Sequence, residues 1–105
     1  MATGDWIDVG AAASLANGAR LTADVDGYYL QVVRIADELY AFEDRCTHDD
    51  APLDDGEIEG TEIICPRHGS RFCLRTGAAL TPPAYEPLKI FAVRQLGERI
   101  EVRTP

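Results

Sequence analysis

Two pairs of one cysteine and one histidine lie close together in the middle of the chain. In the stretch RCTHDDAPL one residue separates Cys46 from His48, and in CPRHGS two residues separate Cys65 from His68. The chain has only three cysteines and two histidines, and four of these five lie within a window of 23 residues. Thiolate and imidazole groups are ligands for zinc and for iron–sulfur clusters. The two pairs therefore predict a four-ligand metal site, with one pair on each of two loops.

The order of the ligands favours an iron–sulfur cluster. A zinc finger groups two cysteines before two histidines and carries the histidines on a helix, whereas each pair here supplies one residue of each type. A [2Fe-2S] cluster with two cysteines on one iron and two histidines on the other needs each loop to reach both irons. The pattern CxH, followed after sixteen residues by CxxH, has this form. A zinc site and a chance grouping of these residues are the alternatives.

Acidic residues concentrate around the first pair. The chain has 18 acids and 10 bases and a net charge of −8. Residues 43–62 hold nine acids and one base, and the rest of the chain holds nine of each, so the whole excess lies in this acidic segment. Binding to a nucleic acid backbone depends on clustered Lys and Arg, which argues against such a partner. A basic protein partner fits better, and a loop kept polar for solubility is the alternative.

The elements that must position the two pairs are predicted to be short strands. Apolar and β-branched residues alternate or run together between turn-forming residues, as in RIEVR, where Ile100 and Val102 are expected to point inward. Turns are expected at Asp26 and Gly27 and at residues 37–38, and one helical turn within residues 10–17. These features predict an all-β sandwich or open barrel. Strands are expected at residues 6–9, 19–25, 28–36, 39–44, 62–65, 71–76, 87–96 and 99–103.

Length and composition predict one domain over residues 1–105, with a loop-rich insert at about 45–70 that carries both pairs. No apolar run approaches the roughly 20 residues of a membrane-spanning helix, and the N-terminal residues lack the basic and apolar parts of a secretion signal. Three cysteines are an odd number for a disulfide framework. We therefore expect a cytoplasmic protein without a membrane partner.

The stretches CTHDDAPL, CPRHGSRFCLRTG and PPAYEPLKIFAVR resemble the Rieske iron–sulfur proteins, and among them the small bacterial Rieske-type ferredoxins. The resemblance covers nearly the whole chain. It implies a fold of three antiparallel sheets with a cluster-binding insert, and one Rieske-type [2Fe-2S] cluster per chain. In this pattern Cys46 and Cys65 bind the inner iron, and His48 and His68 bind the outer iron near the surface.

At several positions the chain has other residues than two further branches of the family, and these differences make a resemblance to those branches weaker. Respiratory Rieske proteins carry an additional, disulfide-bonded cysteine on each loop, at the positions of Ala51 and Arg67, and a tyrosine where this chain has Phe72. Terminal oxygenase subunits usually have other residues where Asp49 and Ser70 stand here, and they contain a further iron domain for which this chain is too short. The resemblance therefore implies an electron carrier that does not itself activate oxygen.

The implied function is one-electron transfer through the Rieske cluster, without catalysis by the chain itself. A flavin-dependent reductase would deliver the electron, and a terminal oxygenase of the aromatic ring-hydroxylating dioxygenase type would receive it. We expect a monomer. Two other functions stay open at this point, namely a small Rieske subunit of a reductase such as nitrite reductase and a zinc-stabilised binding module.

Other residues around the pairs have narrower interpretations. Cys73 is expected to be a small buried hydrophobic residue within a strand. Ser70 either caps the turn after the second pair or donates a hydrogen bond to a sulfur. The family resemblance implies that Pro82 and Pro83 belong to a loop covering one side of the cluster. Phe72, which lacks the hydroxyl of the respiratory tyrosine, predicts a reduction potential at the low end of the Rieske range.

Overall fold

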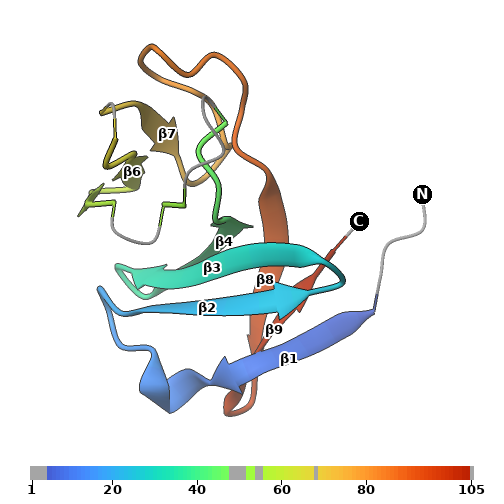
Figure 1. The fold of residues 1–105 in the computed structure, drawn as a ribbon. Helices are drawn as coiled ribbons and strands as arrows, with labels where there is room; N and C mark the ends of the chain where they lie inside the picture. Colours follow the sequence, from blue (N-terminus) through green and yellow to red (C-terminus); the bar gives the residue numbers. More distant parts are fainter. Residues whose placement is uncertain (1–4, 48–51, 54–55, 68, 105) are drawn as a thin grey trace.

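The structure is a computed structural model that describes residues 5–47, 52–53, 56–67 and 69–104. Within these residues the chain forms strands, joined by turns and by one single-turn helix (Figure 1). No helix among the described residues has the length and apolar character needed to cross a membrane. The elements are β1 (Trp6–Ala11), η1 (Ala12–Ser14), β2 (Arg20–Val25), β3 (Tyr28–Ile35), β4 (Glu38–Glu43), β5 (Ile58–Glu59), β6 (Glu62–Ile64), β7 (Arg71–Cys73), β8 (Ile90–Leu96) and β9 (Arg99–Arg103).

The strands form antiparallel sheets, as the sequence predicts. The larger sheet has the order β1-β9-β8-β4-β3-β2, and β5, β6 and β7 form a small sheet. Strand β8 pairs with β4 through Ile90 and Phe91 and with β9 through the residues that follow. Because β8 changes partner along its length, the larger sheet divides into two three-stranded parts. Together with the small sheet, these parts correspond to the three antiparallel sheets that the family resemblance implies.

The small sheet and the long loops gather at one end of the molecule. Figure 1 shows this loop end above β3, with the segments that follow β4 and precede β8 beside β6 and β7. The turn between β8 and β9 lies at the opposite end. The larger sheet is therefore the scaffold, and the small sheet and loops form the part of the molecule that carries Cys46 and Cys65.

Strands β3 and β4 are buried on both faces and separate two cores. Leu30, Val32 and Ala41 belong to the sheet core, whereas Val33 and Phe42 belong to the loop core at the loop end. Successive side chains of a strand point to opposite faces, so one strand contributes to both cores. The sheet core consists of Leu15, Val25, Leu30, Val32, Ala41, Phe91, Ile100 and Val102. The loop core consists of Val33, Phe42, Cys46, Leu53, Ile63, Cys65, Phe72, Leu74, Ala84 and Leu88.

The turn between β2 and β3 is the one expected from the sequence. Asp26 and Gly27 both have positive φ angles, of 52° and 84°. Two consecutive residues in this region are typical of the two-residue hairpin turn whose twist matches that of the flanking strands. This tight turn fixes the register in which β2 pairs with β3.

The turn between β3 and β4 differs from the prediction by one residue. It is formed by Ala36 and Asp37, with φ angles of 51° and 69°, and Glu38 already begins β4. A left-handed conformation is unfavourable for alanine, so no local pattern predicts a turn at Ala36. Asn17 supports the turn from outside the hairpin, because its amide donates to the Asp37 carboxyl group at 3.0 Å and accepts from the Asp37 N–H at 2.8 Å.

Three element boundaries differ from the expected ones by two or three residues, and several others by one residue. Strand β1 continues to Ala11, β7 ends at Cys73, and β8 begins only at Ile90. The short strand β5 was not expected, and it exists because Ile58 and Glu59 pair with residues of β6. The expected helical turn is present as η1. The inward positions predicted for β9 are confirmed by Ile100 and Val102, which are fully buried.

Candidate metal centre

Cys46 lies at the start of the loop that follows β4, and it is fully buried in the loop core. The Asp44 N–H donates to the Tyr29 carbonyl oxygen at 2.8 Å, which continues the pairing of β4 with β3 beyond the end of the strand. Thr47, the next residue after Cys46, is only half-buried. The chain therefore passes from the sheet to the surface within a few residues, with Cys46 on the inner side of this step.

A buried polar network holds the far part of the same loop against the sheet. Arg20 of β2 donates to the Gln31 side-chain oxygen of β3 at 3.0 Å, and the Gln31 amide donates to Oδ1 of Asp44 at 2.9 Å. The guanidinium of Arg20 also donates to the carbonyl oxygens of Leu53 and Gly56, at 2.9 and 2.5 Å. Gln31 is fully buried and Asp44 is 5% exposed. Two neighbouring strands and the residue that follows β4 thus contribute to one network that fixes the return of the first loop.

Cys65 begins the turn that joins β6 to β7. Its N–H donates to the Ser70 carbonyl oxygen at 2.8 Å, and the Gly69 N–H donates to the Cys65 carbonyl oxygen at 3.0 Å. Gly69 has a φ angle of 77°, which glycine adopts without the steric cost of a side chain. Cys65 is 1% exposed and Ser70 is fully buried. The second cysteine is therefore fixed at the closed base of a six-residue turn.

Residues 77–88, which we term the third loop, contact both cysteine-bearing loops. The Ala84 N–H donates to the Ser70 hydroxyl oxygen at 3.2 Å, and the Thr47 hydroxyl donates to the Glu86 carbonyl oxygen at 2.8 Å. Ala84 also packs in the loop core with both cysteines. The third loop therefore connects the first loop to the second through Ala84 and Glu86, which are only two positions apart.

The third loop is closed at its own base. The Leu88 N–H donates to the Gly77 carbonyl oxygen at 2.6 Å, and the Gly77 N–H donates to the Cys73 carbonyl oxygen at 2.7 Å. Immediately after it, the Lys89 carbonyl oxygen accepts from the Glu43 N–H at 2.9 Å. The loop is thus fixed to the end of β7 on one side and to the end of β4 on the other. Pro82 and Pro83, which the family resemblance assigns to a loop that covers the cluster, lie within the third loop.

The structure brings the two predicted cysteine ligands into one core. Cys46 and Cys65 both belong to the loop core, although eighteen residues separate them in the sequence. No disulfide joins the three cysteines, all of which the structure describes. His48 and His68 lie outside the described residues, so their assignment as ligands stays a prediction. Among the described residues no three Cys, His, Asp or Glu side chains form a metal-binding group.

The donor set fits an iron–sulfur cluster. Two buried thiols on two loops that hydrogen bonds hold in place can serve one iron, and thiolate is the ligand that iron–sulfur clusters use. The Ser70 hydroxyl accepts the Ala84 N–H, and its own hydrogen is available to a further acceptor, which a cluster sulfide would supply. Each histidine is close in sequence to one of these cysteines, and its role as a ligand stays a prediction of the sequence.

Two neighbouring residues of β7 contrast with each other. Phe72 is fully buried in the loop core. Cys73 is half-buried, so its interpretation as a small buried residue is wrong. Hydrogen bonds from the Thr76 side chain and from the backbone N–H groups of Thr76 and Arg75 lower the pKa of the Cys73 thiol, against the opposing effect of burial. The strand alternation explains the difference, since successive side chains of β7 point to opposite faces.

Sequence reasoning missed the polar residues that hold the loops. Gln31 interrupts an apolar run, and a buried amide in such a run signals a partner that the sequence alone does not name. Asp44 was counted only as one of many acids, although it is buried and accepts two hydrogen bonds. Thr47, between Cys46 and His48, gave no signal, because its partner is 39 residues away.

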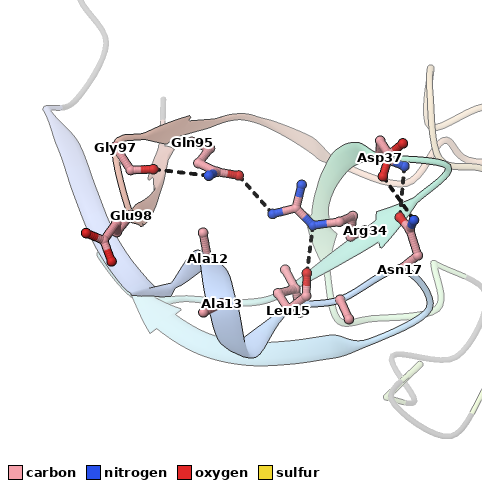
Figure 2. Close-up of a pocket in the computed structure, with 10 residues that line it drawn as sticks. Ala12, Ala13, Leu15, Asn17, Arg34, Asp37, Gln95, Gly97 and Glu98 are labelled. Carbon is pink, nitrogen blue, oxygen red and sulfur yellow. Dashed lines mark hydrogen bonds between the residues drawn. The ribbon is translucent and has the colours of Figure 1, made fainter.

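A hollow in the scaffold lies away from the cysteines. It has a volume of about 540 Å³ and lies between η1, the end of β3 and the β8–β9 turn (Figure 2). Figure 2 shows the Arg34 guanidinium donating to the Leu15 carbonyl oxygen and to the Gln95 side chain, at 2.6 and 2.9 Å. Gln95 in turn donates to the Gly97 carbonyl oxygen at 3.0 Å. These bonds join three segments of the scaffold. The side chains of Arg34 and Gln95 therefore have a structural role in this hollow.

The chain matches the protein-family model of the Rieske [2Fe-2S] domain over residues 5–92. The chain belongs to this family. The matched residues of the Rieske domain include both cysteine–histidine pairs, the small sheet, the third loop and the beginning of β8. The family implies a [2Fe-2S] cluster, which agrees with the donor set described above.

The Rieske domain is similar to ferredoxins of dioxygenase systems. It is 37% identical over 100 residues to the ferredoxin component of the naphthalene 1,2-dioxygenase system of Pseudomonas aeruginosa, covering 95% of this chain and 96% of that protein. The ferredoxin of carbazole 1,9a-dioxygenase from Nocardioides aromaticivorans IC177 has a similar structure, with a TM-score of 0.87 and 36% identity, over 92% of this chain and 95% of that one. A similar chain occurs in a complex of reduced oxygenase and oxidized ferredoxin in carbazole 1,9a-dioxygenase, with a TM-score of 0.86 and 36% identity, over 92% and 91% of the two chains.

Proposed function

We propose that this Rieske domain is a one-electron carrier between a flavin-dependent reductase and the terminal oxygenase of an aromatic ring-hydroxylating dioxygenase system. The observation that carries the proposal is the similarity, over nearly the whole chain, to ferredoxin components of naphthalene and carbazole dioxygenase systems. In this function the chain transfers electrons and performs no catalysis of its own. The oxygenase, which is a separate protein, carries out the reaction with oxygen.

One [2Fe-2S] cluster per chain would be held by Cys46 and Cys65 on one iron and by His48 and His68 on the other. The bound cluster supplies a couple that accepts and releases a single electron, and neutral imidazole ligands raise its potential above that of an all-cysteine cluster. The burial of both cysteines in the loop core supports this assignment for the inner iron. The histidine assignment rests on the sequence pattern.

The described residues would position the cluster ligands and exclude water from the cysteine side. The network of Arg20, Gln31 and Asp44 fixes the first loop, and the closed turn between Cys65 and Ser70 fixes the second. The third loop connects the two, which would limit their relative movement when the charge of the site changes. A small structural change on electron transfer favours rapid exchange with a partner.

Residues 1–105 would form one Rieske domain, with the cluster-binding insert at about 45–70, and the monomer and the cytoplasmic location stay predictions of the sequence. Two alternatives differ in measurable ways. A small Rieske subunit of a reductase such as nitrite reductase would form a lasting complex with a large subunit. A zinc-stabilised binding module would be colourless. The similarity to separate ferredoxin components favours the mobile carrier.

The first experiment tests the cofactor. The protein purified without oxygen should be brown and contain two irons and two sulfides per chain, and reduction should give an EPR signal with an average g value below that of the free electron. Cys46→Ser and Cys65→Ser should abolish the cluster, whereas the control Cys73→Ser should retain it. Stoichiometric zinc in a colourless protein would contradict the assignment.

The second experiment tests the role. The protein is combined with NADH, a flavin-dependent ferredoxin reductase and the oxygenase component of a naphthalene or a carbazole dioxygenase. Product formation should depend on the wild-type protein and should be absent with Cys65→Ser. Failure of the cluster-loaded protein to support turnover with either oxygenase would reject the proposed partners while leaving the cofactor assignment intact.

A further inference from the structure

Tyr85 is an exposed aromatic side chain at the loop end of the molecule. Its side chain is 83% exposed, compared with 56% for Leu96, 51% for Tyr29 and 46% for Leu80. Among the described residues no other large hydrophobic side chain is exposed to this extent. An isolated exposed apolar residue needs no explanation, so the inference depends on how Tyr85 is held and on what surrounds it.

The backbone on either side of Tyr85 is fixed to the two cysteine-bearing loops. Its predecessor, Ala84, donates to the Ser70 hydroxyl oxygen, and its successor, Glu86, accepts from the Thr47 hydroxyl. Thr47 lies between the two residues of the first pair, and Ser70 lies just after the second pair. Tyr85 is therefore held beside both predicted ligand loops while its side chain projects into solvent. Such an arrangement lowers the entropy lost when a partner covers the ring.

Tyr85 also forms one wall of a shallow hollow. The hollow has a volume of about 240 Å³ and includes Leu80 on another wall. The Leu80 N–H donates to the Arg71 carbonyl oxygen at 2.8 Å, and the Thr81 hydroxyl accepts from the Arg71 N–H at 2.9 Å, so the backbone of this wall is attached to β7. Two exposed apolar side chains on a fixed backbone thus face a space large enough for one apolar side chain of a partner.

The charge of the acidic segment indicates the character of the partner. The segment, residues 43–62, carries the whole net charge of −8, and it includes Thr47, whose hydroxyl donates to the Glu86 carbonyl oxygen beside Tyr85. The side chain of Arg71, whose backbone bonds Leu80 and Thr81, pairs with Glu59 and Glu62 at 3.0 and 3.2 Å, which reduces its ability to attract an anion. A complementary surface would present an apolar side chain surrounded by Lys and Arg.

We infer that Tyr85, together with Leu80, is the apolar anchor through which the terminal oxygenase binds this protein, and that the oxygenase inserts an apolar side chain, surrounded by Lys and Arg, into the hollow between them. The inference rests on the proposed function, since it names the contact made by the partner proposed there. The acidic segment steers the encounter, and the anchor fixes the orientation in which the predicted ligand loops face the oxygenase. Aromatic residues at the centre of an interface commonly carry a large share of the binding energy.

The experiment measures binding of the cluster-loaded protein to the oxygenase components of naphthalene and carbazole dioxygenases. Tyr85→Ala should raise the Kd by about tenfold, which corresponds to about 1.4 kcal/mol. Tyr85→Gln, which keeps a side chain of moderate length, should have a similar effect, and Leu80→Ala a smaller one. Tyr85→Phe should stay within about twofold of the wild type, because it keeps the ring. The matched control is Leu96→Ala, which removes an exposed apolar side chain near the opposite end of the molecule.

Cluster content, absorption spectrum and reduction potential are measured for every variant and should equal those of the wild type. Binding by Tyr85→Ala and Tyr85→Gln as tight as that of the wild type would overturn the inference and leave the proposed function standing. An equal loss of binding in Leu96→Ala would also overturn it, because the effect would not be local to the hollow. If the wild-type protein neither binds nor supplies electrons to either oxygenase, the proposed function itself fails.

Discussion

The Leu53 N–H donates a 2.6 Å hydrogen bond to Oδ1 of Asp44. The same oxygen accepts the Gln31 amide at 2.9 Å, and the other carboxyl oxygen of Asp44 is buried without a hydrogen-bond partner among the described residues. Asp44 lies two residues before Cys46, and Leu53 packs with Cys46 in the loop core. One buried carboxyl group therefore sets both the departure of the first loop from the sheet and its return.

Asp44→Ala should lower the midpoint of urea unfolding more than any removal of an exposed acid. The substitution leaves the N–H of Leu53 and the amide of Gln31 buried without their acceptor, at a cost of roughly 1–3 kcal/mol for each group. Asp44→Asn keeps one acceptor oxygen and should lose less. Asp24→Ala on β2 is the control, since Asp24 is exposed. Equal midpoints for Asp44→Ala and Asp24→Ala would show that the network adds no stability.

Gly77→Ala should destabilise the protein strongly through the base of the third loop. Gly77 has a φ angle of 84°, and a Cβ atom there would overlap the Leu88 carbonyl oxygen. Gly97→Ala is the matched control, because Gly97 also has a positive φ angle, of 61°, and has open space around it. The control should cost about 1 kcal/mol from backbone conformation alone, and Gly77→Ala at least about twice that. Urea unfolding of both variants measures the difference, and equal losses would remove the steric explanation.

Phe72→Tyr should raise the reduction potential of the cluster-loaded protein. Phe72 is fully buried in the core that holds Cys46 and Cys65, so a hydroxyl placed there would reach toward the site from inside. A donor directed at a ligand sulfur stabilises the more negative, reduced state, and one such bond should shift the potential by tens of millivolts, given that ~59 mV is a tenfold change for one electron. Protein-film voltammetry measures the shift. Phe91→Tyr, the same change in the sheet core, is the control. A negative shift, or an equal shift in the control, would contradict the prediction.

The thiol of Cys73 should react with iodoacetamide at a lower pH than an ordinary cysteine. The hydrogen bonds from Thr76 and from the backbone N–H groups of Thr76 and Arg75 favour the thiolate and lower the pKa below the ordinary value of 9.0. Thr76→Val removes the side-chain donor, so the midpoint of the pH–rate profile should move upward, and Thr76→Ser should restore it. Mass spectrometry of the labelled holoprotein follows the reaction, with Cys73→Ser as the unlabelled control. A profile that does not change in Thr76→Val would exclude the hydroxyl as the cause.

Electron transfer to the oxygenase should slow as the salt concentration rises. Exposed charges are screened over about 10 Å at 0.1 M ionic strength, so steering by the acidic segment weakens above that concentration. Asp49→Asn combined with Asp50→Asn should reduce the slope of the rate against salt. The same charge change at Asp5 and Asp24, two exposed acids outside the segment, is the control. Stopped-flow measurements with equal slopes for both double variants would assign the acids a role in solubility alone.

Local signals account for what the sequence predicted correctly. The dipeptide of Asp26 and Gly27 specifies its turn through the conformations that these residues tolerate, and the alternation of Ile100 and Val102 specifies the inner face of β9. The loop positions predicted for Cys46 and Cys65 are confirmed, because turn-forming residues surround both cysteines in the sequence. Each of these features can be evaluated within a short window of the chain.

The features that the sequence did not predict depend on residues far apart. The turn formed by Ala36 and Asp37 is supported by the bonds between Asn17 and Asp37, and the two-residue strand β5 exists only through its pairing with β6. The buried positions of Gln31 and Asp44 follow from a network that also includes β2. A short stretch of sequence contains only one of the two partners of each such contact. These features therefore form only when the strands have assembled.

The third loop also has a consequence for the order in which the protein matures. Cys46 and Cys65 become fully enclosed only when Ala84 and Leu88, which come later in the chain, join the loop core. During synthesis from the N-terminus, both cysteine–histidine pairs emerge before these residues do. Iron and sulfide would therefore reach the cysteines more readily in the nascent chain, before Ala84 and Leu88 pack against them.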